Sequence, residues 1–212
     1  MDSITRNFKK HYHSTFSAYG PTAKGVDWKN QASADLRSYL MLEIIVNHPK
    51  NQIPSILDVG CGYGSLLEIA QRQKISLNYT GIDIVPEMIA LAKKSHPSAK
   101  FLNKDIFSFS SRNRFDYVIA NGLLTQKLHA TDSVMEKFMF RLINKMWSFA
   151  KLGIAFNNLT SRVDFKNPEN FYYDPALLLK KTEKLTRFFK IRHDTSFFEY
   201  TTYLYKKSPL KL

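Results

Sequence analysis

A glycine-rich stretch, Asp58-Val59-Gly60-Cys61-Gly62-Tyr63-Gly64, constrains the fold of this chain more than any other feature. It follows an apolar run over residues 55–60 that predicts a buried strand, and it leads into a helical pattern over residues 63–74. Glycines at such a turn let the backbone bend tightly and let a ligand approach without a Cβ in the way. The free N–H groups that open the following helix can bind a carboxylate. The stretch therefore predicts a ligand site at the end of a strand.

The spacing of these glycines separates two kinds of cofactor. A dinucleotide fingerprint, G-x-G-x-x-G, would place its third glycine at position 65, where this chain has Ser65. The chain also carries Asp58 two positions before Gly60, and a carboxylate repels a pyrophosphate. The same carboxylate attracts a ligand that has an ammonium and a sulfonium group. The pattern therefore favours an amino-acid-bearing cofactor over NAD.

Strand and helix patterns alternate along most of the chain. The predicted strands are residues 55–60, 79–84, 100–103, 115–120, 153–158, 188–193 and 198–206, and the predicted helices are residues 33–48, 63–74, 86–95, 134–150 and 175–183. Such alternation predicts right-handed crossovers and a mostly parallel sheet with helices on both faces. The last two strands are too close together for a helix between them, so we predict that they pair as an antiparallel hairpin.

Further polar residues stand at the ends of the next three predicted strands. Asp83 can accept hydrogen bonds from both hydroxyls of a ribose, and Asp105 can accept one from the amino group of an adenine. Ile84 and Ile106 are placed to sandwich the adenine ring, and Asn121-Gly122 marks the expected position of a reacting group. Each residue alone has a structural alternative as a cap or turn former. Their occurrence at successive strand ends, in this order, argues for one ligand site.

The runs ILDVGCGYG, GIDI, NKDIF and FDYVIANG, within residues 55–122, resemble the successive motifs of class I S-adenosylmethionine-dependent methyltransferases. The resemblance implies an α/β, Rossmann-like sheet of seven strands in the order 3-2-1-4-5-7-6, with strand 7 antiparallel. It implies S-adenosyl-L-methionine as the cofactor and S-adenosyl-L-homocysteine as the product, with the three motif glycines at the methionine end. The residues expected to bind this cofactor are Asp58, Gly60, Cys61, Gly62, Tyr63, Gly64, Asp83, Ile84, Met88, Asp105, Ile106, Asn121 and Gly122.

The chain is expected to form a single domain over residues 1–212, with an N-terminal arm over residues 1–35 and a core over residues 36–206. Within the arm, residues 19–28 resemble a stretch of bacterial small-molecule methyltransferases of this class that folds over the cofactor. We therefore expect Tyr19 and Trp28 to contact the cofactor. The alternative is an arm that only packs against the sheet.

The acceptor of the methyl group is harder to infer. A loop over residues 160–174 is expected to shape the acceptor pocket, with Phe171-Tyr172-Tyr173 as its aromatic walls. His193, Asp194 and Tyr19 are the candidate proton acceptors, although a histidine beside an aspartate is often only a turn residue. The reaction expected is methyl transfer to an O or N nucleophile of a small molecule or a glycan-type acceptor.

The charge of the chain leaves other acceptors open. The formal net charge is +13, from 31 basic and 18 acidic residues, and the excess is spread along the chain. It indicates either a solvated basic surface or attraction to an anionic acceptor. It also motivates two alternatives, a methyltransferase that acts on RNA or protein and a non-catalytic cofactor-binding regulatory subunit. No base-flipping motif follows the fourth strand, where the chain reads Asn121-Gly122, so specific binding of nucleic acid is not expected.

Other classes of site and location are disfavoured. His11 and His13 have no partnering ligand cluster in the sequence, so we expect surface histidines and no metal site. The single cysteine, Cys61, excludes an internal disulfide, and its place in the glycine loop argues against a nucleophilic role. No apolar run is long enough for a membrane span and the first residues lack a signal-peptide core, so the cytoplasm is the default location. The oligomeric state is not predicted.

Overall fold

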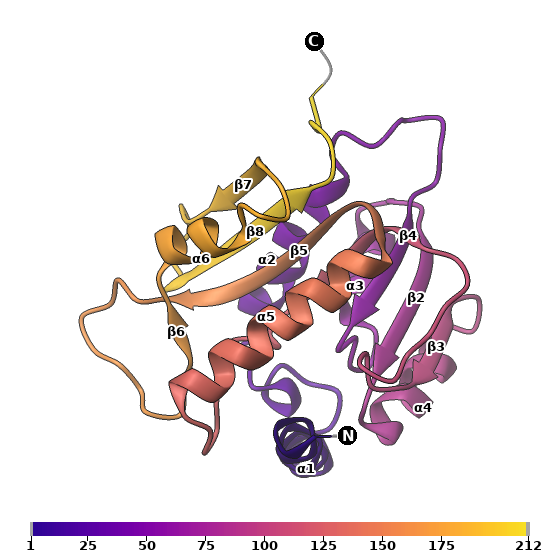
Figure 1. Ribbon diagram of the computed structural model, residues 1–212. Helices are drawn as coiled ribbons and strands as arrows, with labels where there is room; N and C mark the ends of the chain where they lie inside the picture. The colour runs from indigo at the N-terminus through magenta and orange to yellow at the C-terminus, as the bar shows by residue number, and fades with distance from the viewer. Residues whose placement is uncertain (1, 211–212) are drawn as a thin grey trace.

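The computed structural model describes residues 2–210. Its strands are β1 (Ser55–Val59), β2 (Asn78–Asp83), β3 (Lys100–Asn103), β4 (Phe115–Ala120), β5 (Ala150–Thr160), β6 (Tyr172–Tyr173), β7 (Phe188–Arg192) and β8 (Glu199–Tyr205). Its helices are α1 (Ser3–Tyr19), α2 (Gln31–Leu42), α3 (Ser65–Arg72), α4 (Pro86–Ser95), α5 (Asp132–Phe149) and α6 (Pro175–Thr182), with short 3-10 turns η1 (Lys24–Val26) and η2 (Glu43–Ile45). All strands belong to one sheet (Figure 1).

The order of the strands confirms the expected topology. The main path is β3-β2-β1-β4-β5-β8-β7, and β6 pairs in parallel with the end of β5. The first five strands of this path run parallel, and β8 runs antiparallel to both β5 and β7. The late hairpin therefore inserts its second strand beside β5 and leaves β7 at the edge of the sheet. This is the Rossmann-like arrangement predicted from the motifs.

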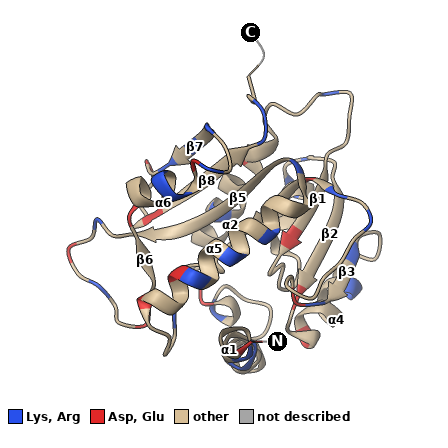
Figure 2. Cartoon of the chain, viewed as in Figure 1, with Lys and Arg blue, Asp and Glu red and all other residues tan. Residues whose placement is uncertain are grey.

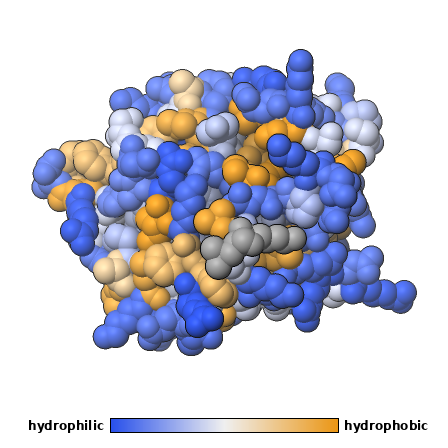
Figure 3. Space-filling view, turned by 90° about the horizontal axis from the view of Figure 1, so that it is seen from above, coloured by the Kyte–Doolittle hydropathy of each residue, from blue (hydrophilic) through white to orange (hydrophobic). Residues whose placement is uncertain are grey.

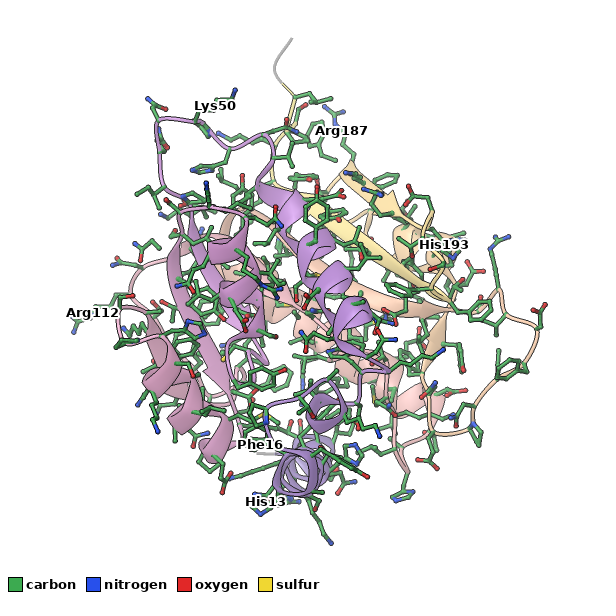
Figure 4. The ribbon with its side chains drawn as sticks, turned by 180° about the vertical axis from the view of Figure 1, so that it is seen from behind. His13, Phe16, Lys50, Arg112, Arg187 and His193 are labelled. Carbon is green, nitrogen blue, oxygen red and sulfur yellow. The ribbon has the colours of Figure 1, made fainter. Side chains whose placement is uncertain are left out.

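Helices cover both faces of the sheet because successive strand residues alternate between two apolar clusters. Leu57 of β1 packs into the cluster with α5, α6 and the first turns of α1, whereas its neighbour Ile56 packs into the cluster with α2, α3 and α4. Figure 4, seen from behind, shows α2 lying across the second face. Both clusters are fully buried at their centres, as the side chains of Met139 and Met41 show. The sheet is thus a rigid platform whose strand ends are fixed.

Several parts of the chain differ from the prediction. The helix predicted over residues 33–48 ends earlier, because α2 stops at Leu42 and the 3-10 turn η2 follows it. The expected arm of short elements contains α1, a helix of 17 residues that Asp2 caps by accepting the N–H of Thr5 at 2.9 Å. Its apolar residues Ile4, Phe8, Tyr12 and Phe16 recur every four positions, so the sequence does carry a helical pattern that the prediction of an arm did not use. The fifth strand was expected to end at position 158, before a loop over residues 160–174. It continues to Thr160 because β8 pairs with it as far as Leu159.

The surface carries its basic residues on most elements. Figure 2 shows Lys and Arg spread over helices, strands and loops without a single continuous stripe. On the side opposite α1, the surface is largely hydrophilic with scattered hydrophobic patches (Figure 3). Within residues 2–210, none of the helices has the length and apolar character that crossing a membrane requires.

Candidate functional site

A cavity of about 1140 Å³, counted out to open solvent, lies at the carboxyl ends of β1, β2 and β4. Residues at the strand ends form its floor, and residues of α1 with residues 26–28 form its cover. Figure 1 shows α1 lying at this end of the sheet. Parallel strands bring their carboxyl ends to one edge, which is why residues far apart in sequence meet there. The predicted site residues that line the cavity are Asp58, Gly60, Cys61, Gly62, Tyr63, Asp83, Ile84, Met88, Asp105, Ile106, Asn121, Gly122 and Trp28.

The glycine loop leaves room for a ligand. Gly62 has φ +54°, and a Cβ placed on it would meet no atom closer than the Met88 sulfur at 3.7 Å and a Val26 methyl carbon at 3.9 Å. A side chain there would fill the cavity and would adopt a backbone conformation that L residues rarely take. Gly64 does not line the cavity. It precedes α3, and a Cβ there would meet His96 and Phe101 instead.

The Asp83 carboxylate is held in place by the backbone. Its two oxygens accept the N–H of Gly62 at 2.9 Å and the N–H of Val85 at 2.8 Å. Burial raises the pKa of Asp83, and these two hydrogen bonds oppose that shift. Each oxygen keeps a further lone pair, so the carboxylate can accept two hydroxyl groups from a ligand. This geometry suits the ribose of a nucleoside.

The Asp58 carboxyl group lies beneath the glycine loop. It accepts a hydrogen bond from the Tyr79 hydroxyl at 2.6 Å, and its side chain is buried. Burial raises the pKa of Asp58 to about 7, the Tyr79 hydrogen bond opposes this, and the nearby charge of Asp83 adds to it. A positively charged ligand in the cavity would favour the ionised carboxylate. Asp58 therefore fits a cationic cofactor.

The other two strand ends supply hydrogen-bonding groups and apolar surfaces. Asp105 accepts the N–H of Phe107 at 2.9 Å, and Ile84 and Ile106 line the cavity beside it. The side-chain oxygen of Asn121 is buried and has no hydrogen-bond partner among the described residues. A ligand donor would satisfy this atom. Together with the open glycine loop, these groups fit a nucleoside that carries an amino acid.

The cover of the cavity contains residues that the sequence did not single out. Helix α1 contributes Thr5, Phe8 and Tyr12, and the segment after it contributes Asp27. The carboxylate of Asp27 lies 2.6 Å from Nε2 of His11, which was expected to be a surface histidine. The two residues are 16 positions apart, and only the turn that follows α1 brings them together. No local sequence pattern indicates this pair.

The predicted catalytic residues lie elsewhere. His193 and Asp194 are exposed on the link after β7, far from α1 (Figure 4), and Asp194 pairs with Arg192 at 2.7 Å. Tyr19, the last residue of α1, is 54% exposed and does not line the cavity. The expected aromatic walls do not line it either, because Phe171 and Tyr173 are buried in the core beside α5.

Comparison with known proteins agrees with the fold and the motifs. A family model described as a methyltransferase domain matches residues 56–144. A protein of Mycobacterium tuberculosis described as a methyltransferase is 30% identical over 160 residues, which cover 73% of this chain and 94% of that protein. Trans-aconitate 2-methyltransferase of Escherichia coli is 31% identical over 88 residues, which cover 42% of this chain and 35% of that enzyme.

A solved structure shares the whole architecture. Magnesium protoporphyrin IX methyltransferase from Synechocystis PCC 6803, with bound S-adenosylhomocysteine, has a TM-score of 0.71 at 15% identity. The match covers 97% of this chain and 100% of that one. The fold and the cavity define a nucleoside-binding protein of the Rossmann-like type. The chain belongs to the class I S-adenosylmethionine-dependent methyltransferases, and its cofactor is S-adenosyl-L-methionine.

Proposed function

We propose that the protein transfers the methyl group of S-adenosylmethionine to an oxygen or nitrogen atom of a small molecule or glycan-type acceptor. The observation that carries this proposal is the cover of the cavity. Because α1 and residues 26–28 lie across the strand ends, an acceptor must fit between them and the sheet. A folded RNA or protein surface would not fit under that cover, whereas a small molecule would.

The charges that line the cavity point to an acceptor without negative charge. Four carboxylates line it, those of Asp27, Asp58, Asp83 and Asp105, against the single ammonium of Lys104. Such a site attracts a cationic cofactor and disfavours an anion. Among the described residues, the other Lys and Arg side chains do not line the cavity, and Figure 2 shows them spread over most elements. An uncharged acceptor therefore fits better than the anionic one that the net charge suggested.

The walls beyond the cofactor residues are apolar. They comprise Phe8 and Trp28 from the cover, Leu123 after β4, and Phe138 with Leu142 from α5. These side chains exclude water and suit an aromatic or alicyclic acceptor face. The polar groups on this side are few, with the Thr5 hydroxyl buried and without a partner among residues 2–210. Such a group can orient one polar atom of the acceptor.

The chain itself supplies alignment and a proton acceptor in this proposal. When bound, S-adenosylmethionine supplies a methyl group on a positively charged sulfur, which departs as a neutral thioether. Asp83 and Asp105 hold the nucleoside, and the glycine loop gives room to the methionine part. Asp27, with His11 hydrogen-bonded behind it, receives the proton that an acceptor hydroxyl or amine loses. Precise positioning provides most of the rate enhancement.

An acceptor screen tests the proposal. The protein and S-adenosylmethionine are incubated with a panel of uncharged aromatic and alicyclic alcohols and amines, glycans, bulk RNA and denatured protein. Formation of S-adenosylhomocysteine and a mass gain of one methyl group are measured for each. We expect turnover with a small molecule or glycan, reduced in Asp27→Asn at unchanged cofactor affinity. Methylation of only RNA or protein would overturn the proposal and favour the macromolecular alternative.

A further inference from the structure

A closed ring of contacts joins the cover of the cavity to the sheet beneath it. We call it the Arg37 ring, and it consists of Trp28, Arg37, Glu199, Asn157 and Gly122. Trp28 and Gly122 line the cavity, whereas the other three members lie behind it. The five residues come from the cover, α2, β8, β5 and the turn after β4. A contact ring of this kind couples the position of each member to the others.

Arg37 and Glu199 form the charged part of the ring. The Nε atom of Arg37 donates to both carboxylate oxygens of Glu199 at 2.9 Å, and Nη2 also contacts that carboxylate. The Nη1 atom donates to the carbonyl of Ser33 at 2.9 Å. The two side chains are only 11% and 9% exposed. The guanidinium is thus fixed in one orientation, which its planar fork favours.

Asn157 connects the pair of Arg37 and Glu199 to the turn after β4 by hydrogen bonds. Its amide nitrogen donates to Glu199 at 3.0 Å, and its amide oxygen accepts the N–H of Gly122 at 2.7 Å. The side chain is 1% exposed, so no solvent competes for these bonds. Glu199 therefore decides which way the Asn157 amide points, because a carboxylate accepts only the NH₂ side.

Gly122 and Trp28 close the ring. Gly122 has φ +84°, and a Cβ on it would lie 2.7 Å from a Trp28 ring carbon, so the indole rests directly on its backbone. The indole also lies against the guanidinium of Arg37, whose Cζ is 4.4 Å from the ring centroid. A second aromatic ring, that of Phe197, also contacts the guanidinium, with its centroid 4.0 Å from Cζ. A cation in contact with two aromatic rings holds both of them in place.

Stability alone is a weak reason for such an arrangement. Two charges taken out of water lose about as much hydration energy as their attraction returns, so an apolar pair would serve the fold as well. Neither residue of the pair lines the cavity, so neither is placed to bind a ligand directly. What the pair does provide is a fixed orientation for Asn157, and through it for the two residues that face the cavity.

We propose that Arg37, Glu199 and Asn157 are positioning residues, which fix the Gly122 turn and Trp28 where the cofactor meets the acceptor. This inference rests on the proposed function, because that function places the cofactor and the acceptor at this part of the cavity. It also explains how the cover keeps a fixed position relative to the strand ends. The ring makes the cover and the turn move as one unit.

The test uses Trp28 as its own reporter. The chain has two tryptophans, so the full-length Trp147→Phe protein emits from Trp28 alone. In this background, the double variant Arg37→Met, Glu199→Met replaces the ion pair by an apolar pair of similar length. We expect its melting temperature to remain close to that of the parent, with a shifted Trp28 emission. We expect its Kd for S-adenosylhomocysteine to rise about tenfold, as is usual for coupled sites.

Two further variants separate positioning from simple folding. Asn157→Leu keeps the ion pair but removes the acceptor of the Gly122 N–H, and we expect it to weaken S-adenosylhomocysteine binding to a similar degree. As a matched control, Arg192→Met with Glu43→Met removes another Arg–Glu pair between an N-terminal element and the late hairpin, away from the cavity. We expect this control to bind as the parent does.

The outcomes separate a failure of the proposed function from a failure of the positioning role. If the parent protein does not bind S-adenosylhomocysteine at all, the proposed function fails, whatever the ring does. If the parent binds it and the Met–Met variant and Asn157→Leu both bind equally well, with unchanged Trp28 emission, the ring is only a structural contact and the inference is overturned. If only the Arg37→Met, Glu199→Met variant unfolds, the binding of S-adenosylhomocysteine by Asn157→Leu decides whether the inference holds.

Discussion

The buried carboxyl group of Asp58 predicts that cofactor binding releases a proton near neutral pH. Burial raises its pKa to about 7, so the group is about half protonated at pH 7 in the free protein. S-adenosylmethionine brings a sulfonium and an ammonium charge into the cavity, which favours the carboxylate and lowers this pKa. If the bound pKa falls toward its ordinary value, binding releases about 0.9 proton at pH 6, about 0.5 at pH 7 and about 0.1 at pH 8.

Calorimetry measures this release directly. Binding is followed at each pH in two buffers of different ionisation enthalpy, and the difference in observed heat gives the number of protons exchanged. Asp58→Asn keeps the shape of the side chain and removes the titration, so it should abolish most of the release. Burial also raises the pKa of Asp83, and three backbone hydrogen bonds oppose that shift. A proton count near zero at pH 6 in the parent, or a count unchanged in Asp58→Asn, would refute the reasoning.

The same shift makes the free protein less stable as the pH rises. Because the folded pKa lies above the unfolded one, the contribution of Asp58 to stability is complete below about pH 4 and is lost as the pH passes about 7. Between pH 6 and pH 8 the loss is about 1.4 kcal/mol, which corresponds to a fall of roughly 3–5 °C in melting temperature. Thermal denaturation of Asp58→Asn should show a correspondingly smaller fall over this range.

Three other changes have definite expected results. Asp83→Ala removes a carboxylate placed for the ribose hydroxyls, so titration calorimetry should show the Kd for S-adenosylhomocysteine raised about 10- to 100-fold, and an unchanged Kd would speak against that role. Phe8→Ala removes the aromatic side chain that packs on Phe138, so the amides of α1 should exchange hydrogen faster while those of β4 stay protected. Equal acceleration in both would show that α1 is part of the global core. Binding of a mixed RNA, measured by filter retention, should disappear between about 50 and 200 mM salt, and a nanomolar complex at physiological salt would favour the RNA alternative.

Local sequence patterns predicted most of the fold and the residues expected to bind the cofactor. Asp58, Asp83 and Asp105 each follow an apolar run that predicts a strand. The carboxyl ends of parallel strands lie at one edge of an α/β sheet, so these three residues are expected to lie close together. The bounds of α4 and β4 were predicted to the residue, because Pro86 and the run before Asn121 are unambiguous signals. The position of a strand along the chain therefore sufficed to place these residues in one cavity.

Contacts between segments that are distant in the sequence could not be predicted from local patterns. His193 was predicted as a proton acceptor on the link of the late hairpin, but β7 is the outermost strand and the cavity lies over β1 and β4. The pair of His11 and Asp27 depends on the turn after α1, and that of Arg37 and Glu199 joins residues 162 positions apart. Such pairs are set by tertiary packing, which has no local periodicity. Most of the residues that form the cover of the cavity, Asp27 among them, were missed for that reason.

Binding of S-adenosylhomocysteine tests the central claim most directly, because it needs no knowledge of the acceptor. Titration calorimetry of the full-length protein should give a Kd in the micromolar range, about −8 kcal/mol in free energy, with one site per chain. The matched titration with NADH should give no heat of binding, since Asp58 and Ser65 do not suit a pyrophosphate. Tight binding of NADH together with no detectable binding of S-adenosylhomocysteine would contradict the account.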